Sequence, residues 1–361
     1  MAGVPSAYDL GRDELAGLLA GEPAFRTLQV WDGLYRRGLR PGEMTDLPSG
    51  LRDRLEAALP PALTPTVVSE GDRGATTKWL WRLADGANVE SVLMRYPGRA
   101  TVCVSSQAGC AMGCSFCATG QAGFTRHLTA GEIVEQVVAA RRVAAPSRVS
   151  NVVFMGMGEP LANYDRVWRA VEVLQSELGL GARHLTISTV GVVPGIDRLA
   201  AETLQVTLAV SLHAARDELR DRLVPLNRRY PIDVLMAACA RYRERSGRRL
   251  SFEWALIEGV NDTGRDAREL AALARPLRAH VNLIPLNPTP GYPVRGTSPD
   301  GVRRFRDALE AGGVAATVRD TRGADIDAAC GQLAVRVAGP AIRHRSPASS
   351  DAPASSDAPA S

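Results

Sequence analysis

Lysine is almost absent from this chain of 361 residues. Only Lys78 is a lysine among the 43 basic residues, and all the others are arginines. A GC-rich genome is the simpler explanation, because alanine, glycine and proline are also abundant. Guanidinium groups also suit phosphate forks and stacking on bases. The 39 acidic residues leave a net charge of only +4, so the composition permits a nucleic-acid partner without requiring one.

Long hydrophobic runs are missing as well. No stretch approaches the roughly 18 uninterrupted apolar residues that a membrane span needs. The first residues, MAGVPSAYDLGRDELAG, lack the basic and apolar regions of a secretory signal. We therefore expect a cytoplasmic protein without membrane contact. An apolar fraction of 45% is ordinary for a globular chain of about two domains.

Cysteine is scarce but clustered. Four of the six cysteines lie between positions 103 and 117. In a chain without an export signal, this clustering favours metal-binding or catalytic thiols over a disulfide framework. The six are Cys103, Cys110, Cys114, Cys117, Cys239 and Cys330.

The pattern of apolar residues divides the chain into three parts. Residues 12–59 are predicted to form short helices, which makes residues 1–62 a small helical accessory domain. The proline-rich segment 60–66 is predicted to be a linker. Residues 67–340 are predicted to form a barrel with a hairpin at its start. The tail 341–361 repeats SSDAPAS, has no apolar periodicity and is expected to be disordered.

Alternating strands and helices predict an α/β fold. The runs TTKWLWRL and VESVLMRY flank the turn signal Asp85-Gly86 and predict a hairpin. Seven strand candidates follow, separated by helical patterns, one of which opens with a capping box at Thr129 and Glu132. We expect a parallel sheet closed or nearly closed into a partial (β/α)6 barrel, with a doubly wound open sheet as the alternative. The strand candidates are 101–106, 151–156, 184–189, 205–212, 251–257, 281–286 and 315–319.

The most informative segment is Cys110-Ala-Met-Gly-Cys114-Ser-Phe-Cys117, directly after the first of these strands. Three thiolates spaced C-x3-C-x2-C on a tight loop can converge on one metal centre. Three is one fewer than a closed zinc site or a fully ligated cubane uses, which leaves one coordination position open. An open position suits a reactive site. A structural zinc with His127 or Cys330 as fourth ligand remains the alternative.

A second segment, Gly156-Met-Gly158-Glu159-Pro160, follows the next strand. Glycines allow the backbone to approach a ligand closely, and a carboxylate can accept hydrogen bonds from an ammonium group. Barrels place their sites at the carboxyl ends of their strands, so we expect this segment to line the site. Alone, it would be a glycine-rich turn with an incidental glutamate.

Six segments together resemble one family, the RlmN-type radical S-adenosylmethionine (SAM) methyltransferases. The resemblance runs in order from about residue 20 to 337. Members of this family methylate C2 of an adenine in 23S rRNA and of an adenine in certain tRNAs. The segments are CVSSQAGCAMGCSFCATGQAGF, VVFMGMGEPLANY, ISTVGVVPGID, LAVSLHA, LIPLNPTPG and VRDTRGADIDAACGQL.

The resemblance implies the cofactors and their ligands. One 4Fe-4S cluster would be held by Cys110, Cys114 and Cys117, and SAM would chelate the open iron. Two SAM molecules would be used per turnover, one as methyl donor and one as the source of a 5′-deoxyadenosyl radical. The residues that carry over as SAM-binding are Gly158, Glu159, Ser188, Ser211, Leu212, His213 and Asn287.

Three further residues receive reaction roles from the resemblance. Cys330 would carry the methyl group, and its S-methyl carbon would become the radical that adds to the adenine. Cys103 would then attack the sulfur of Cys330 and release the RNA through a transient disulfide. Glu90 would be the proton acceptor. Considered alone, Cys103 reads as a buried small hydrophobe, Glu90 as a surface carboxylate and Cys239 as a core residue.

The resemblance implies 23S rRNA and certain tRNAs as partners, together with an electron donor such as a flavodoxin-type reductant, and a monomer is the expected state. Arginine clusters at 36–40, 241–249 and 303–306 are more simply explained as solvated helix faces. The first is the best candidate for an RNA contact, because the N-terminal part resembles the RNA-facing domain of the family. Two alternatives remain open. One is the related class that methylates C8 of the same adenine, and the other is a non-enzymatic, metal-stabilised RNA-binding protein.

Overall fold

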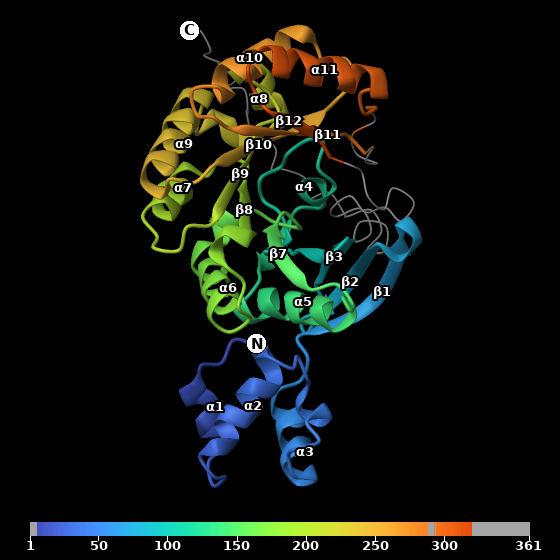
Figure 1. The fold of residues 1–361 in the computed structure, drawn as a ribbon, viewed down its shortest axis with the longest axis vertical. Helices are drawn as coiled ribbons and strands as arrows, with labels where there is room; N and C mark the ends of the chain where they lie inside the picture. The colour runs from blue at the N-terminus through green and yellow to red at the C-terminus, as the bar shows by residue number, and fades with distance from the viewer. Residues whose placement is uncertain (1–5, 288–291, 293, 320–361) are drawn as a thin grey trace, which may run out of the picture.

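A ten-stranded sheet organises the chain in the computed structural model, which describes residues 6–287, 292 and 294–319 (Figure 1). The first four strands pair antiparallel, and the pairs from the fourth strand onward are parallel. In order across the sheet the strands are β1 (Leu63–Gly71), β2 (Thr76–Leu83), β3 (Asn88–Tyr96), β4 (Arg99–Cys103), β7 (Val149–Phe154), β8 (Leu185–Thr189), β9 (Thr207–Ser211), β10 (Leu250–Leu256), β11 (His280–Pro285) and β12 (Ala316–Val318).

The predicted parallel sheet is confirmed, and all seven strand candidates form. From β4 to β12 the spatial order follows the chain and never reverses, whereas a doubly wound sheet reverses at its switch point. The partial barrel is therefore the correct alternative. No ladder joins β12 to β1 within the described strands, so the barrel stays open.

Helices cover the outer side of the curved sheet, as Figure 1 shows for α6, α7, α9, α10 and α11. The capping box predicted for α5 is confirmed, since Thr129 Oγ1 accepts from Glu132 N and Glu132 Oε2 accepts from Thr129 N. No helix in the described part of the chain is long and apolar enough to cross a membrane. The outer helices are α5 (Ala130–Val143), α6 (Tyr164–Ser176), α7 (Val193–Ala200), α9 (Ile232–Ser246), α10 (Gly264–Ala274) and α11 (Pro299–Ala311). A further helix, α8 (Asp217–Leu223), packs with Cys114 in a separate apolar cluster.

The predicted hairpin is confirmed as β2 and β3, but the predicted linker 60–66 is partly wrong. Strand β1 already begins at Leu63 and includes Pro65. Pro65 is tolerated because β1 is an edge strand, and its pairing with β2 shifts register between Pro65 and Val67. A residue without an N–H group is accommodated at such a bulge on an edge, where the ladder is already interrupted.

Three short helices precede the sheet: α1 (Arg12–Leu18), α2 (Phe25–Tyr35) and α3 (Ser49–Ala58). They lie beside α5 and α6 at the blue end of the chain in Figure 1. Their buried residues belong to the same apolar core as the barrel. Polar contacts reinforce the packing, with Trp31 Nε1 donating to Glu177 Oε2 at 2.7 Å. A division into domains at residues 62 and 67 stays a prediction.

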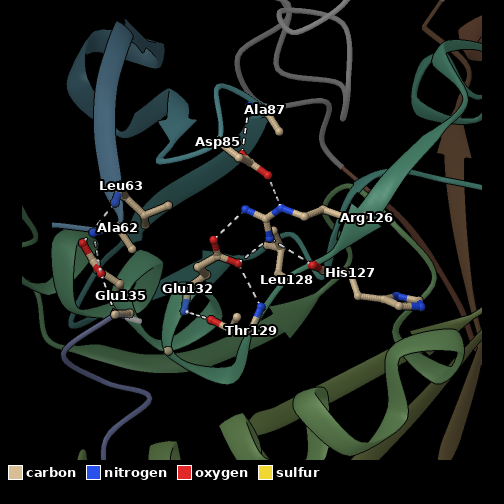
Figure 2. Close-up of polar contacts among 12 residues, drawn as sticks. Ala62, Leu63, Asp85, Ala87, Arg126, His127, Leu128, Thr129, Glu132 and Glu135 are labelled. Carbon is tan, nitrogen blue, oxygen red and sulfur yellow. Dashed lines mark hydrogen bonds and ion pairs between the residues drawn. The ribbon is translucent and has the colours of Figure 1, made fainter. Parts of the chain in front are cut away.

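Arg126 connects the hairpin turn to α5 (Figure 2). It lies on β6 (Phe124–His127), the strand that returns from the cysteine-rich loop and pairs with β5 (Gln107–Gly109). Its guanidinium donates to both carboxylate oxygens of Glu132, at 2.7 and 2.8 Å, and forms an ion pair with Asp85. The hydrogen bond to Glu132 is the main reason that the pKa of Arg126 is raised. The end of the hairpin and the cysteine-rich loop are thus held to one helix.

Glu135 ties the entry into β1 to the same helix (Figure 2). Its carboxylate accepts hydrogen bonds from the backbone N–H groups of Ala62 and Leu63 and from Ser6 Oγ. Burial raises the pKa of Glu135 to about 7, although these three donors oppose the shift. The folded chain therefore holds a proton that the unfolded chain releases near pH 4.5.

We expect the free energy of unfolding to fall as pH rises from 4.5 to 7, because the ionised Glu135 carboxylate is disfavoured only in the folded state. Relative to Glu135→Gln, the wild type should lose about 2 kcal/mol across this window. Urea unfolding at several pH values measures the difference, with the exposed Glu244→Gln as control. Equal pH slopes for wild type and Glu135→Gln would contradict this expectation.

Candidate active site

The three clustered cysteines lie on a loop between β5 and α4 (Ala118–Ala122). Cys110 N donates to Gly123 O at 2.7 Å, and Cys117 N donates to Cys114 O at 3.2 Å, so the loop closes on itself. Gly109, which precedes it, has φ +77°, and a side chain there would collide with the carbonyl of Gly123. The thiols are presented from one short, tightly folded turn.

Burial makes the thiols of Cys110 and Cys114 poor anions in the absence of a positive partner. Cys114 is buried, and Cys110 and Cys117 are half-buried. Burial raises the pKa of Cys110 to about 12 and raises that of Cys114 as well, with the neighbouring thiols and Glu159 adding to the effect. A bound metal centre would supply the missing positive charge and displace the protons.

The donor set suits a cluster with an open coordination position. Within residues 6–287, 292 and 294–319, no three His, Cys, Asp or Glu side chains are grouped as ligands of one metal ion. A cubane binds each thiolate to a different iron and therefore takes ligands that are spread more widely. Three thiols on one loop, with no fourth protein ligand beside them in the described chain, match a cubane with one open iron.

Glu159 lies in the segment that follows β7, and its negative charge acts on the thiols of Cys110 and Cys114. Its Oε1 accepts from Leu161 N at 3.0 Å and its Oε2 from Val190 N at 2.9 Å. The side chain is 2% exposed, and burial raises its pKa to about 7. The same carboxylate contributes to the raised pKa of Cys110. A cationic ligand placed here would stabilise the ionised form of Glu159.

The glycines of this segment also allow close packing within the chain. A Cβ at Gly156 would lie 2.6 Å from the carbonyl group of Val104. Gly158 has φ +103°, and its Cβ would lie 2.5 Å from Gln107 Cβ. Both glycines therefore allow β7 to pack closely against the segment that follows β4. The SAM contact of Gly158 stays a prediction.

The other predicted SAM residues follow neighbouring strands. Ser188 lies in β8, Ser211 ends β9, and Asn287 comes two residues after β11. In a parallel sheet these positions lie on the same edge as the end of β7. The structure thus places Glu159, Ser188, Ser211, Leu212, His213 and Asn287 at the carboxyl ends of the strands.

His213 is held against the cysteine loop as a neutral ring. Its Nδ1 accepts from Ala255 N at 3.0 Å, so its proton lies on Nε2. Burial, with Arg220 nearby, lowers its pKa to about 3. The ring meets Phe116 of the loop edge to face, with centroids 4.7 Å apart. His213 is therefore both a packed structural residue and a possible hydrogen-bond donor at the site.

Arg220 on α8 is a functional candidate that the sequence analysis missed. Its guanidinium is buried and donates to the carbonyl oxygens of Leu212 and Val190, at 3.0 and 2.6 Å, and to Asn227 Oδ1. Burial lowers its pKa to about 10, which still leaves it charged at neutral pH. It joins the loops after β8 and β9, and no carboxylate forms an ion pair with it in the described chain. One arginine among so many gave no signal in the sequence.

Glu90 is not the surface carboxylate that it resembles when considered alone. It is 2% exposed, and its Oε2 lies 2.9 Å from Nζ of Lys78, which is fully buried. The sequence analysis noted Lys78 only as a compositional oddity. The structure places it in a buried ion pair with the predicted proton acceptor.

Cys103 ends β4 and is a half-buried free thiol. Burial raises its pKa, while Arg319 opposes the shift. Its predicted partner Cys330 lies outside the described residues, as does the tail 341–361. Cys239 is buried in α9, which confirms it as a core residue.

Five of the eleven arginines in the predicted clusters form ion pairs with acids in the part of the chain that the structure describes. Arg36 forms an ion pair with Asp32, and Arg37 forms one with Asp46 at 3.1 Å. Arg40 has no ion-pair partner among the residues that the structure describes. Within the first cluster, its positive charge is therefore the one that no ion pair compensates. Several arginines of the other clusters are also paired, namely Arg241, Arg303 and Arg306.

The chain is similar to known radical SAM proteins over most of its length. Residues 104–273 match the Radical SAM superfamily. It is 55% identical to a dual-specificity RNA methyltransferase RlmN of Parafrankia sp., over 94% of this chain and 93% of that protein. It is 52% identical to the RlmN of Thermobifida fusca, over 90% and 92% of the two chains.

A solved structure agrees with this likeness. The crystal structure of a radical SAM methyltransferase from Sphaerobacter thermophilus superimposes with a TM-score of 0.87 at 54% identity. The match covers 91% of this chain and 98% of that one.

Arg220→Met should lower the free energy of unfolding by about 3 kcal/mol, because buried carbonyl oxygens from two loops lose their donor. We also expect weaker SAM binding, since these loops carry Glu159's partner Val190 and the predicted SAM residue Leu212. Urea unfolding and equilibrium dialysis with SAM measure the two effects. Arg222→Met, on the exposed side of α8, is the matched control. A variant as stable as this control would contradict the assigned role.

Proposed function

The chain belongs to the RlmN-type radical SAM RNA methyltransferases, and we propose that it methylates C2 of an adenine in 23S rRNA and of an adenine in certain tRNAs. The observation that carries this proposal is the pairing of two sites in one barrel. A loop of three thiols lies beside the buried Glu159, and a buried acid and a free thiol lie at Glu90 and Cys103. The dual-specificity names of the relatives support both RNA substrates.

In this proposal Cys110, Cys114 and Cys117 hold a 4Fe-4S cluster, which when bound supplies the electron that cleaves SAM. Glu159 accepts a hydrogen bond from the SAM amino group, since its carboxylate is already oriented by two backbone donors. His213 presents a neutral Nε2–H donor to the same ligand. Ser188, Ser211, Leu212, Gly158 and Asn287 complete the proposed SAM site.

The RNA chemistry is proposed to use two thiols and an acid. Cys330 takes a methyl group from one SAM and transfers its carbon to C2 of the adenine after a second SAM has supplied the radical. Glu90 accepts the proton that leaves C2. The thiolate of Cys103 then attacks the sulfur of Cys330, so that an S–S bond forms as the S–C bond to the RNA breaks, and the released carbon keeps the bonding electron pair and takes up a proton to become the methyl group. A cellular reductant restores both thiols for the next cycle.

The partners follow from this chemistry. An electron donor such as a flavodoxin-type reductant would reduce the cluster site. The RNA substrates would place the enzyme in the cytoplasm. We expect it to act as a monomer. We propose that residues 1–62 face the RNA. Arg40 is the best-supported contact of that part, because its neighbours Arg36 and Arg37 already have acidic partners.

Cys103→Ala should methylate Cys330 and attach it to RNA but fail to release the product. Cys330→Ala should neither acquire an S-methyl group nor attach to RNA. Denaturing gels with labelled RNA and peptide mass spectrometry measure both outcomes, with the buried Cys239→Ala as control. Free methylated RNA at normal yield from Cys103→Ala would contradict this division of roles.

Product mapping tests the site of methylation. Unmodified rRNA and tRNA fragments are incubated with labelled SAM and the reduced enzyme, and the nucleosides are compared with C2- and C8-methyladenosine standards. We expect the C2 product, whereas the C8 product would assign the chain to the related resistance class. Protein that is colourless and loaded with zinc after anaerobic reconstitution, and that fails to cleave SAM, would instead support an RNA-binding module.

A further inference from the structure

Lys78, Glu90 and Cys103 lie on one face of the sheet. Lys78 is opposite Val92 in the pairing of β2 with β3, and Val92 is opposite Cys103 in the pairing of β3 with β4. Residues directly opposite one another in a ladder project to the same face, and so do residues two apart on a strand. Glu90, two residues before Val92, therefore shares the face of Lys78 and Cys103.

This face lines the interior of the barrel. Cys103 is opposite Val153 on β7, and the next residue in this row across the sheet is Thr186 on β8. Val153 and Thr186 both line a cavity of about 650 Å³. Arg319, which follows β12, lines the same cavity. Lys78 and Cys103 thus belong to a row of residues that reaches this chamber, and Glu90 lies on the same face of the sheet.

The ion pair is held where water hardly reaches. Lys78 Nζ lies 2.9 Å from Glu90 Oε2, with side chains 0% and 2% exposed. The main chain at Glu90 is also held, because Ser105 Oγ donates a hydrogen bond to Glu90 O at 2.5 Å. An ammonium is a compact point charge, whereas a guanidinium is a broad planar fork. In a chain that uses arginine at every other basic position, this site carries the single lysine.

Three charged groups act on the Cys103 thiol from three different elements. Lys78 on β2 and Arg319 after β12 lower its pKa, and Glu90 on β3 raises it, against a background in which burial raises it most. Lys78 and Glu90 therefore oppose each other as long as Glu90 is ionised. Once Glu90 is neutral, Lys78 and Arg319 are the charged groups among the described residues that still act on the thiol.

We propose that Lys78 is a positioning residue, which fixes the Glu90 side chain on the interior face of the barrel and favours the Cys103 thiolate once Glu90 has taken up a proton. This rests on the proposed function, in which Glu90 accepts a proton and Cys103 attacks as a thiolate. Proton uptake at Glu90 removes the counter-charge of Lys78. Cys103 then releases its own proton to bulk water and becomes nucleophilic. The attack thereby follows the proton transfer instead of preceding it.

The test is the pH profile of Cys103 alkylation in the cluster-loaded enzyme without RNA. Iodoacetamide is added at a series of pH values, and the Cys103 peptide is quantified by mass spectrometry. Glu90→Gln, a neutral mimic of the protonated acid, should move the profile to lower pH. Lys78→Met should move it to higher pH, and the double variant should return it toward wild type. Glu70→Gln, an exposed carboxylate on the neighbouring strand, should leave it unchanged.

Superimposable profiles for wild type and Glu90→Gln would overturn the inference, as would a shift of the same size in Glu70→Gln. The proposed function is tested separately, by RNA methylation. If Glu90→Gln methylates RNA at the wild-type rate, its role as proton acceptor is wrong, whatever the alkylation profiles show. The two failures are therefore distinguishable.

Thermal unfolding provides a second measurement on the same variants. Lys78→Met should lower the melting temperature strongly, because it leaves a buried carboxylate without its partner. Lys78→Met combined with Glu90→Gln removes both charges and should recover most of the loss. A double variant no more stable than Lys78→Met would contradict the pairing. If Lys78→Met does not fold, Glu90→Gln and the double variant still carry the alkylation test.

Discussion

Exclusion of water from the candidate site obliges each ionisable side chain to find its partner within the chain. Glu159 receives two backbone N–H groups, Arg220 donates to carbonyl oxygens and an amide, and Lys78 is paired with Glu90. A buried charge without such partners would be costly, so these contacts leave few alternative geometries. The open ends of the barrel strands are thereby held in place before any ligand binds.

The partners of these charges are mostly loops, and this links the parts of the site. Val190 N donates to Glu159 and Val190 O accepts from Arg220, so one residue after β8 connects the segment after β7 to α8. The backbone N–H of Ser115, in the cysteine loop, donates to Leu223 O at the end of α8. Displacement of α8 would therefore disturb the cysteine loop and the Glu159 segment together. Preorganisation of this kind reduces the cost of binding a cofactor.

The sequence predicted the barrel well because strand and helix periodicities are local. Each parallel strand is a short apolar run, and the loop of three cysteines is visible as a spacing. The edge strand β1 was missed because Pro65 resembles a breaker, and only pairing with β2 shows that the bulge accommodates it. Lys78 and Arg220 were missed for another reason. Their roles depend on burial and on partners far along the chain, which neither composition nor periodicity reports.

Composition gains a different meaning once the structure is known. The excess of arginine needs no functional explanation, because many of the exposed arginines simply face acids across helix surfaces. Such exposed pairs contribute little to stability and tolerate exchange of one base for another. The fully buried site of Lys78, whose Nζ lies 2.9 Å from the Glu90 carboxylate, favours lysine over arginine. A guanidinium placed there would need additional acceptors for its five donors. The rare residue is therefore more informative here than the common one, because its place is determined by packing and charge.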